Sequence, residues 1–142
     1  MKLGWNRGKN REFGDYMIKN YKELDVWKNS MLLVQEIYIK TRDFSENEKF
    51  GLVSQMRRAS VSIPSNIAEG WGRKTTKDYV KFLHISLGSL YELETQVIIC
   101  ENINLIDNNN LKEIHQFIKD ISKMLNVLIY KLNKKGNKIE IK

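Results

Sequence analysis

The chain has 142 residues with 24 Lys or Arg and 17 Asp or Glu, which gives a formal net charge of +7 at pH 7. This length fits one domain with a substantial core, and the lone cysteine excludes an intramolecular disulfide and fits a reducing compartment. The N-terminal residues lack the apolar region of a secretory signal and no apolar run approaches the roughly 18 residues of a membrane span, so we expect a cytoplasmic protein.

The excess positive charge lies at the two ends of the sequence. Residues 1–22 carry a net charge of +4 and residues 131–142 another +4, whereas residues 23–130 sum to −1. We therefore expect a flexible basic arm over 1–22, partly helical after Asp15, a globular part over 23–132 and a flexible basic tail over 133–142. Basic arms commonly bind nucleic acid through its phosphates, without sequence specificity.

The first predicted helix spans residues 25–42, and Asp25 is its expected N-cap. Its apolar residues repeat every three or four positions and form one stripe: Trp27, Met31, Val34 and Tyr38. Leu33 and Ile37 widen this stripe. The apolar face is broader than a single partner helix needs.

A capping box of Ser45 and Glu48 predicts the start of the second helix. Its expected inward face consists of Leu52, Met56, Ala59, Ile63 and Ile67. Pro64 either kinks this helix or starts a new one, and the kink is favoured because the apolar spacing continues in phase. Gly70 or Gly72 is expected to end the helix in a left-handed conformation.

The third helix is predicted to begin at a second capping box, Thr75 with Asp78, and to run to about residue 102. Within it, Gly88 between Ser86 and Ser89 predicts a close approach of a neighbouring backbone. Asn110 with Glu113 caps a fourth helix, whose apolar stripe reaches about Leu132. No strand pattern is found, so the predicted fold is all-α, an antiparallel up-down four-helix bundle.

The sequence has no pattern typical of metal binding or catalysis. A di-iron bundle needs Glu three residues before His on two helices, but Lys81 precedes His84 and Lys112 precedes His115 at that spacing. The carboxylates of the third helix lack a partner base or nucleophile. Glu94 is expected to pair with an arginine such as Arg57 or Arg58, inside one bundle or between bundles. We therefore expect no enzyme activity, no metal and no cofactor.

The turn between the second and third helices is the leading candidate site. Four basic residues lie at or near the start of the third helix, where free amides and the helix dipole favour anions: Arg73, Lys74, Lys77 and Lys81. Arg57 and Arg58 lie about four turns back on the preceding helix. Trp71 could stack on a base or close the end of the bundle. The candidate set also includes basic residues of both tails: Arg7, Lys9, Arg11, Lys131, Lys134, Lys135 and Lys138.

The stretch SIPSNIAEGWGRKTTKDYVKFLHISLGSLYELETQ, residues 62–96, resembles the four-helix-bundle family of 23S rRNA intervening-sequence proteins. The resemblance covers about residues 24–132 and extends remotely to the accessory variability proteins of diversity-generating retroelements. It implies a homopentamer, and it makes a role as accessory to a reverse transcriptase the sharper functional hypothesis. We expect a non-enzymatic, oligomeric nucleic-acid-binding protein acting on structured RNA or RNA–DNA intermediates. The alternative is an oligomeric scaffold for protein partners that binds no nucleic acid.

Overall fold

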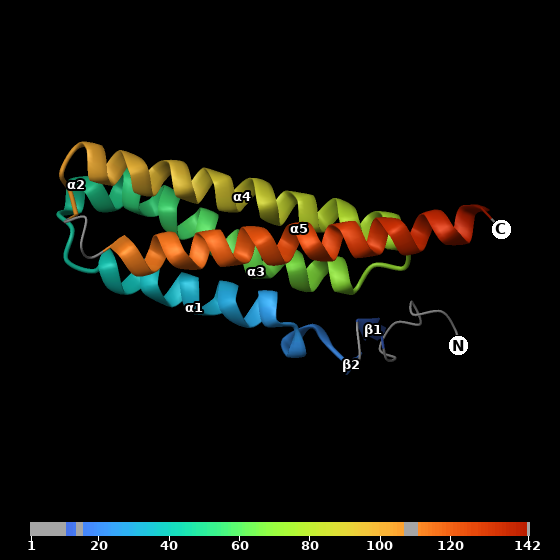
Figure 1. The fold of residues 1–142 in the computed structure, drawn as a ribbon. Helices are drawn as coiled ribbons and strands as arrows, with labels where there is room; N and C mark the ends of the chain where they lie inside the picture. The colour runs from blue at the N-terminus through green and yellow to red at the C-terminus, as the bar shows by residue number, and fades with distance from the viewer. Residues whose placement is uncertain (1–10, 14–15, 107–110, 142) are drawn as a thin grey trace.

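The computed structural model describes residues 11–13, 16–106 and 111–141. Four long helices, α1, α3, α4 and α5, form the body of the molecule, and short elements precede α1 and α3 (Figure 1). In chain order the elements are β1 (Arg11–Phe13), β2 (Tyr16–Ile18), the 3-10 helix η1 (Tyr21–Glu23), α1 (Asp25–Lys40), α2 (Glu46–Glu48), the π-helical η2 (Lys49–Val53), α3 (Ser54–Trp71), α4 (Thr76–Asn102) and α5 (Lys112–Ile141).

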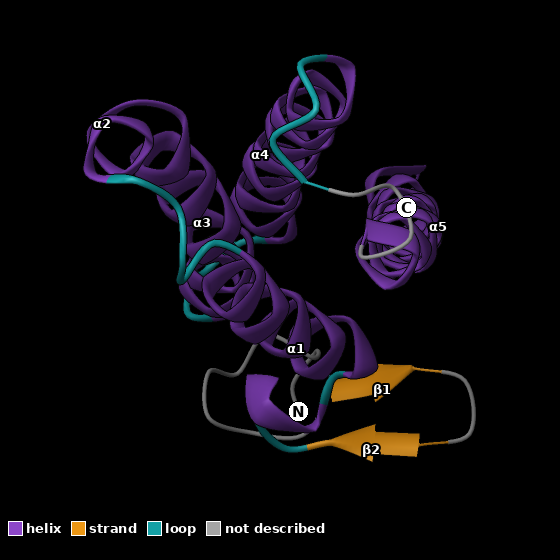
Figure 2. Cartoon of the chain, turned by 90° about the vertical axis from the view of Figure 1, so that its left-hand side faces the viewer, coloured by secondary structure: helices purple, strands orange, loops and turns teal. Residues whose placement is uncertain are grey.

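The four long helices run alternately up and down, and each packs against two neighbours. Seen along the axis they follow one another around the bundle in chain order, so that α5 closes back onto α1 (Figure 2). The contact between α3 and α4 is the most extensive. This arrangement confirms the predicted antiparallel four-helix bundle.

The segment before α1 combines two short strands with a short helix. β1 and β2 pair antiparallel, with Arg11 opposite Ile18 and Phe13 opposite Tyr16. The helix expected after Asp15 is limited to the 3-10 helix η1, and the expectation of no strand was wrong for β1 and β2. Two residues of the type Gly-Asp between two short apolar runs are a hairpin signal, and the sequence carries that pair between β1 and β2. The flexibility expected of this basic arm remains a prediction.

The buried face of α1 differs from the predicted stripe. Val26, Leu33 and Ile37 are buried, because α1 must face both α3 and α5. The predicted stripe lies instead on the flank of α1 that borders α3, where its residues are half-buried or exposed: Trp27, Met31, Val34 and Tyr38. Much of the apolar surface of α1 is therefore not used by the core of this chain.

The helix ends confirm one predicted cap and correct two others. The Thr75 hydroxyl oxygen accepts a hydrogen bond from the backbone N–H of Asp78 at 3.1 Å, as predicted for the start of α4. Asp25 is the first residue of α1 rather than its N-cap. Gly72 ends α3 with φ −78°, so the expected left-handed stop is wrong. Left-handed backbone occurs instead after α4, at Asn104 with φ 59°. The predicted cap at Asn110 lies outside the described residues.

The second predicted helix is divided, although not at Pro64. Helical structure begins at Glu46, directly after Ser45, but Gly51, inside η2, has non-helical angles (φ −94°, ψ −105°) that break the helix between α2 and α3. α3 then continues through Pro64 to Trp71. The chain therefore starts no new helix at Pro64, as the in-phase apolar spacing predicted. The extent of a kink at Pro64 remains a prediction.

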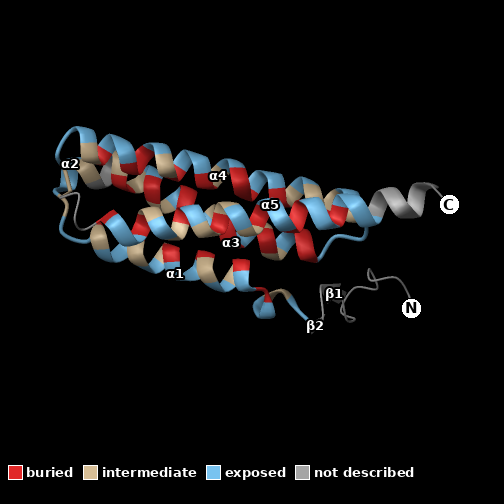
Figure 3. Ribbon diagram, viewed as in Figure 1, coloured by how far each residue is buried: buried red, intermediate tan, exposed pale blue. Residues whose placement is uncertain are grey.

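The core runs along the whole bundle, with buried positions facing inward on all four long helices (Figure 3). Two serines of α4 form hydrogen bonds to α3. The Ser86 hydroxyl donates to the Ile63 carbonyl at 2.9 Å, and the Ser89 and Ser62 hydroxyl oxygens lie 2.8 Å apart. A Cβ on Gly88 would meet nothing within 4 Å, so the close approach predicted there does not occur within this chain.

α5 extends beyond its predicted end. Helical structure continues past Leu132 to Ile141, through residues that the sequence suggested were a flexible tail. Once a helix is nucleated, each further residue adds a hydrogen bond, so the roughly 1 kcal/mol that Gly136 costs does not stop it. None of the helices among the described residues is long and apolar enough to cross a membrane.

Candidate nucleic-acid interface

Positive charge gathers at one end of the bundle. We call this the basic end and define it as residues 18–28, 65–90 and 121–135, which lie together at the right of Figure 1. It carries eleven Lys or Arg and four Asp or Glu, and every one of the eleven is exposed. The other half, residues 29–64, 91–106 and 111–120, carries seven basic and nine acidic residues. We call it the far end.

The turn from α3 into α4 forms one side of the basic end. Arg73, Lys74, Lys77 and Lys81 are all exposed there, around an α4 N-terminus whose dipole also favours anions. The guanidinium of Arg73 lies over the ring of Phe82, 5.0 Å from its centroid. The four basic residues predicted at this corner are therefore accessible to a polyanion.

The second half of α5 forms the adjacent side. Because α5 runs antiparallel to α4, its Lys131, Lys134 and Lys135 come beside the start of α4. The sequence contains no acidic residue between Asp120 and Glu140. The fold thus unites two basic clusters that are about 50 residues apart in the sequence, the corner and the C-terminal lysines.

The corner itself is held by tight packing around Gly70. A Cβ there would lie 2.8 Å from Cβ of Phe82 and 3.0 Å from Cδ1 of Tyr79, so only glycine lets α3 and α4 approach so closely. The ring of Trp71 meets that of Tyr79 edge-on, with centroids 6.2 Å apart. These contacts fix where the basic residues of the turn are presented.

Trp71 does not present a ring for base stacking. Its side chain is only 6% exposed and belongs to the core. Of its two predicted roles, closing the end of the bundle fits the structure and stacking on a base does not. The flanking glycines were a misleading signal, since Gly70 serves helix packing.

Arg57 and Arg58, two of the predicted site residues, lie at the far end of the bundle. The Nε of Arg57 donates to the Thr41 hydroxyl oxygen at 3.1 Å, and its guanidinium lies 4.6 Å from the centroid of the Tyr38 ring. Within this chain Arg57 therefore joins α3 to the end of α1 and does not pair with Glu94. A pair of Glu94 with an arginine of another bundle remains a prediction. Arg58 is exposed.

The remaining predicted basic residues are only partly described. Arg7 and Lys9 lie outside the described residues. Arg11 is in β1 and Lys138 is in α5, but the structure describes only their backbone. The role of these four residues in binding phosphates remains a prediction.

The far end holds the acidic and titratable groups that could suggest chemistry. Nε2 of His115 lies 3.0 Å from Oε2 of Glu101, whereas the other histidine, His84, is exposed at the basic end. Cys100 is buried with its sulfur 3.5 Å from that of Met56, and burial, aided by Glu48 and Glu101, raises its thiol pKa to about 11. Among the described residues, no three His, Cys, Asp or Glu side chains come together as metal ligands would.

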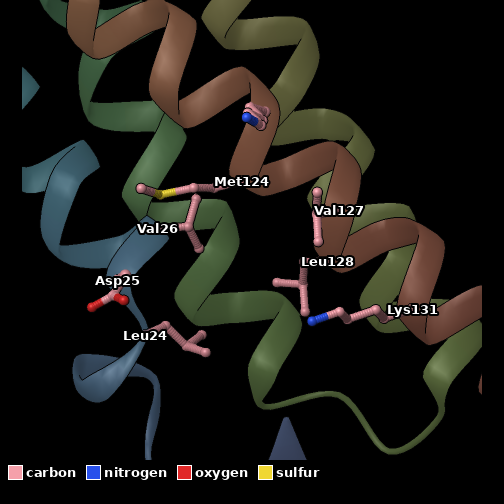
Figure 4. Close-up of a pocket in the computed structure, with 8 residues that line it drawn as sticks. Leu24, Asp25, Val26, Met124, Val127, Leu128 and Lys131 are labelled. Carbon is pink, nitrogen blue, oxygen red and sulfur yellow. The ribbon is translucent and has the colours of Figure 1, made fainter. Parts of the chain in front are cut away.

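An apolar groove borders the basic end between α1 and α5. Its volume is about 330 Å³, and Val26, Met124 and Leu128 line its apolar walls. Lys123 and Lys131 belong to its rim, and Figure 4 shows Lys131 reaching along α5 toward Leu128. The groove places apolar surface directly beside exposed ammonium groups.

A second groove follows the outer side of the α1–α3 contact. Trp27, Met31 and Val34 of α1 face Val61 and Pro64 of α3 across it. It is therefore where the unused apolar surface of α1 meets apolar residues of α3.

Five side chains of the basic end were not among the predicted site residues: Lys19, Lys22, Lys28, Lys123 and Tyr130. Lys123 and Tyr130 are both exposed on α5, and Tyr130 is the most exposed large apolar side chain among the described residues, at 65%. The sequence does indicate that Lys123 and Tyr130 share an exposed face of the fourth helix. Positions 119, 123, 126, 130 and 134 recur at helical spacing on the face opposite the apolar stripe.

Comparison with known proteins agrees with this fold. Residues 22–127 match the family described as 23S rRNA-intervening sequence protein. A crystal structure of a protein with unknown function from the S23 ribosomal protein family of Bacteroides thetaiotaomicron has a similar fold, with a TM-score of 0.67 and 23% sequence identity over 74% of this chain and 95% of that one. A search of curated proteins finds no match. By its sequence match over most of its length, the chain belongs to the 23S rRNA-intervening sequence protein family.

Proposed function

We propose that this protein is a non-enzymatic nucleic-acid-binding protein that holds structured RNA, or an RNA–DNA intermediate, against its basic end. The observation that carries this proposal is the separation of charge, with eleven exposed basic residues at the basic end and a surplus of acids at the far end. A polyanion is attracted to the first surface and repelled by the second. The family's association with 23S rRNA favours RNA as the polyanion.

Binding of this kind depends on phosphates more than on base sequence. Lysine ammonium groups at the basic end are flexible point charges, suited to phosphate contacts. Each contact releases counterions and adds roughly −0.7 to −0.9 to the slope of log affinity against log salt concentration. We expect affinity that falls steeply with salt and differs little between sequences.

We also propose that copies of the chain associate through the α1–α3 groove. Met31 is 37% exposed and Val61 is 40% exposed, and both lie beside half-buried Trp27 and Val34. Burying this surface removes apolar area from water. An assembly would repeat the basic end on every subunit and so strengthen binding of a long polyanion. The homopentamer and a reverse transcriptase as partner are the corresponding finer proposals that the family resemblance suggests. A cytoplasmic location is a further proposal, favoured by the lone cysteine.

Two triple variants test the site. Lys74, Lys77 and Lys131 changed to Gln remove three charges from the basic end, whereas Arg42, Arg58 and Lys112 changed to Gln remove three from the far end; all six side chains are exposed. Binding of a fluorescent RNA hairpin is measured from about 50 to 200 mM salt. We expect the first variant to lose on the order of 100-fold in affinity at low salt and to flatten the slope by about 2. The second should stay within a few-fold of the wild type.

Equal losses in the two variants would show that net charge alone attracts RNA and would contradict a site at the basic end. A wild type that binds no hairpin at 50 mM salt would instead favour an oligomeric protein scaffold. The α1–α3 groove is tested separately by light scattering after size exclusion. The wild type should have several times the monomer mass of 16.8 kDa, and Met31→Lys should lower that mass.

A further inference from the structure

We propose that Tyr130 is a stacking site for an unpaired nucleobase, so that the basic end selects RNA with single-stranded nucleotides over fully paired duplex. This inference rests on the proposed function and adds a ligand class to it. It starts from the exposure of the Tyr130 ring, which is 65%. Every nucleobase has a π-face that can stack on an exposed aromatic ring, whatever the sequence.

The other aromatic rings of the basic end are occupied within the protein. Trp71 and Tyr79 pack edge-on against each other inside the core. The half-buried ring of Phe82 has the Arg73 guanidinium over it. Tyr21 packs edge-on against Trp27, with centroids 5.4 Å apart. Within the described part of the basic end, Tyr130 is therefore the aromatic side chain best placed to meet a base.

The neighbours of Tyr130 suit the nucleotides on either side of a stacked base. Nζ of Lys134 lies 6.0 Å from the centroid of the Tyr130 ring. Lys123 lies about two turns earlier on the same exposed side of α5, and the exposed Asn133 lies one turn after Tyr130. Asn126, one turn before Tyr130, donates its Nδ2 to the Ser122 carbonyl at 2.9 Å. Ammonium groups can hold the flanking phosphates, and amides can hydrogen-bond base edges.

Two other exposed tyrosines have closer partners within the protein than Tyr130, whose ring lies 6.0 Å from the Lys134 ammonium. The hydroxyl of Tyr91 lies 3.4 Å from that of Ser122, and the ring of Tyr38 is covered by the Arg57 guanidinium. Tyr91 is 47% exposed on the neighbouring helix α4, and Glu92 follows it in the sequence. Tyr91 is thus a matched control, an exposed helical tyrosine whose hydroxyl lies against a second helix.

The test compares Tyr130→Ala, Tyr130→Phe and Tyr91→Ala for binding to a 12-nucleotide oligouridine and to a blunt 12-base-pair RNA duplex. Stacking on one aromatic side chain is worth about 1–3 kcal/mol per base. We therefore expect Tyr130→Ala to weaken oligouridine binding by about tenfold and duplex binding by less than twofold. Tyr130→Phe, which keeps the ring, and Tyr91→Ala should bind both RNAs like the wild type.

The salt dependence separates stacking from charge. A ring releases no phosphate counterion, so Tyr130→Ala should lower the affinity for oligouridine without changing the slope, whereas Lys134→Gln should reduce the slope by about 0.7. Equal affinity of wild type and Tyr130→Ala for oligouridine would overturn the stacking site and leave the proposed function intact. An equal loss of affinity of Tyr130→Ala for oligouridine and for the duplex would also overturn the stacking site. A wild type that binds neither RNA would overturn the proposed function itself.

Discussion

The two ends of the bundle are built from the same four helices but differ in both charge and backbone. At the basic end, α3 passes into α4 through a tight turn locked by Gly70, Trp71 and Tyr79, and every basic side chain is exposed. At the far end, α3 begins only after the irregular backbone at Gly51, acids outnumber bases, and Arg57 is tied to Thr41. Basic residues therefore have different roles at the two ends. Those of the basic end are exposed to solvent, whereas Arg57 at the far end contacts Thr41 and the Tyr38 ring.

The largest effect on stability should come from Trp71, whose side chain closes the basic end. Trp71→Ala leaves a cavity beside Tyr79, and we expect a loss of about 3–5 kcal/mol in the free energy of unfolding, measured by urea denaturation. Tyr130→Ala, at an exposed position, should change it by less than about 0.5 kcal/mol. A Trp71→Ala variant as stable as the wild type would contradict the packing role assigned to this ring.

Gly70 of α3 and Gly88 of α4 allow a comparison of a tightly packed glycine with an unpacked one. Gly70→Ala places a methyl group against Phe82 and Tyr79, and we expect it to destabilise the protein by about 1–3 kcal/mol. In Gly88→Ala the added methyl group meets nothing within 4 Å, and alanine favours the helix more than glycine does. We expect this variant to be more stable than the wild type by up to about 1 kcal/mol. Thermal melting of both variants checks the signs. If Gly88 packs against another copy in the assembly, its substitution should instead destabilise and lower the mass in solution.

Arg57 tests whether the far-end arginines bind RNA or hold helices together. Arg57→Gln removes the hydrogen bond to Thr41 and the contact with the Tyr38 ring, and we expect a loss of about 1–2 kcal/mol in stability. RNA affinity should stay within about twofold of the wild type. A large loss of affinity with unchanged stability would return Arg57 to the nucleic-acid site predicted from the sequence.

Cys100 should give an effect that appears only at alkaline pH and is absent near neutral pH. Its thiol pKa is raised to about 11 in the folded protein by burial and by the nearby carboxylates, so the folded state favours the neutral thiol. The unfolded chain releases that proton at lower pH, and the contribution of Cys100 to stability is therefore full below about pH 8.5 and lost as pH rises toward 11. Urea titrations from pH 8 to 11 should show a shallower decline for Cys100→Ala than for the wild type. Parallel declines would contradict the raised pKa.

The sequence predicted the features that depend on local patterns. The apolar spacing gave the four helices and the continuation through Pro64, and Thr75 with Asp78 gave the start of α4, because these signals depend on neighbours within one or two turns. The buried face of α1 could not be deduced in this way. The apolar face of this helix is wide, and the positions of α3 and α5 decide which part of it is buried.

The candidate site was predictable in composition but not in arrangement. The sequence identified the corner lysines and the C-terminal lysines separately, and only the antiparallel path of α5 brings them to one end. Trp71 was ambiguous because its burial depends on the distant ring of Tyr79 and on the approach of Phe82 to Gly70. Tyr130 was overlooked because it falls outside the apolar stripe used to define the helix.

The central claim, that RNA lies against the basic end, is tested most directly by footprinting lysines. The protein is acetylated with and without a saturating RNA hairpin that carries an unpaired loop, and the modification at each lysine is measured by mass spectrometry. We expect protection of Lys74, Lys77, Lys81, Lys131 and Lys134, with Lys112 and Lys40 at the far end modified equally in both samples. Uniform protection at both ends, or protection confined to the far end, would contradict the claim.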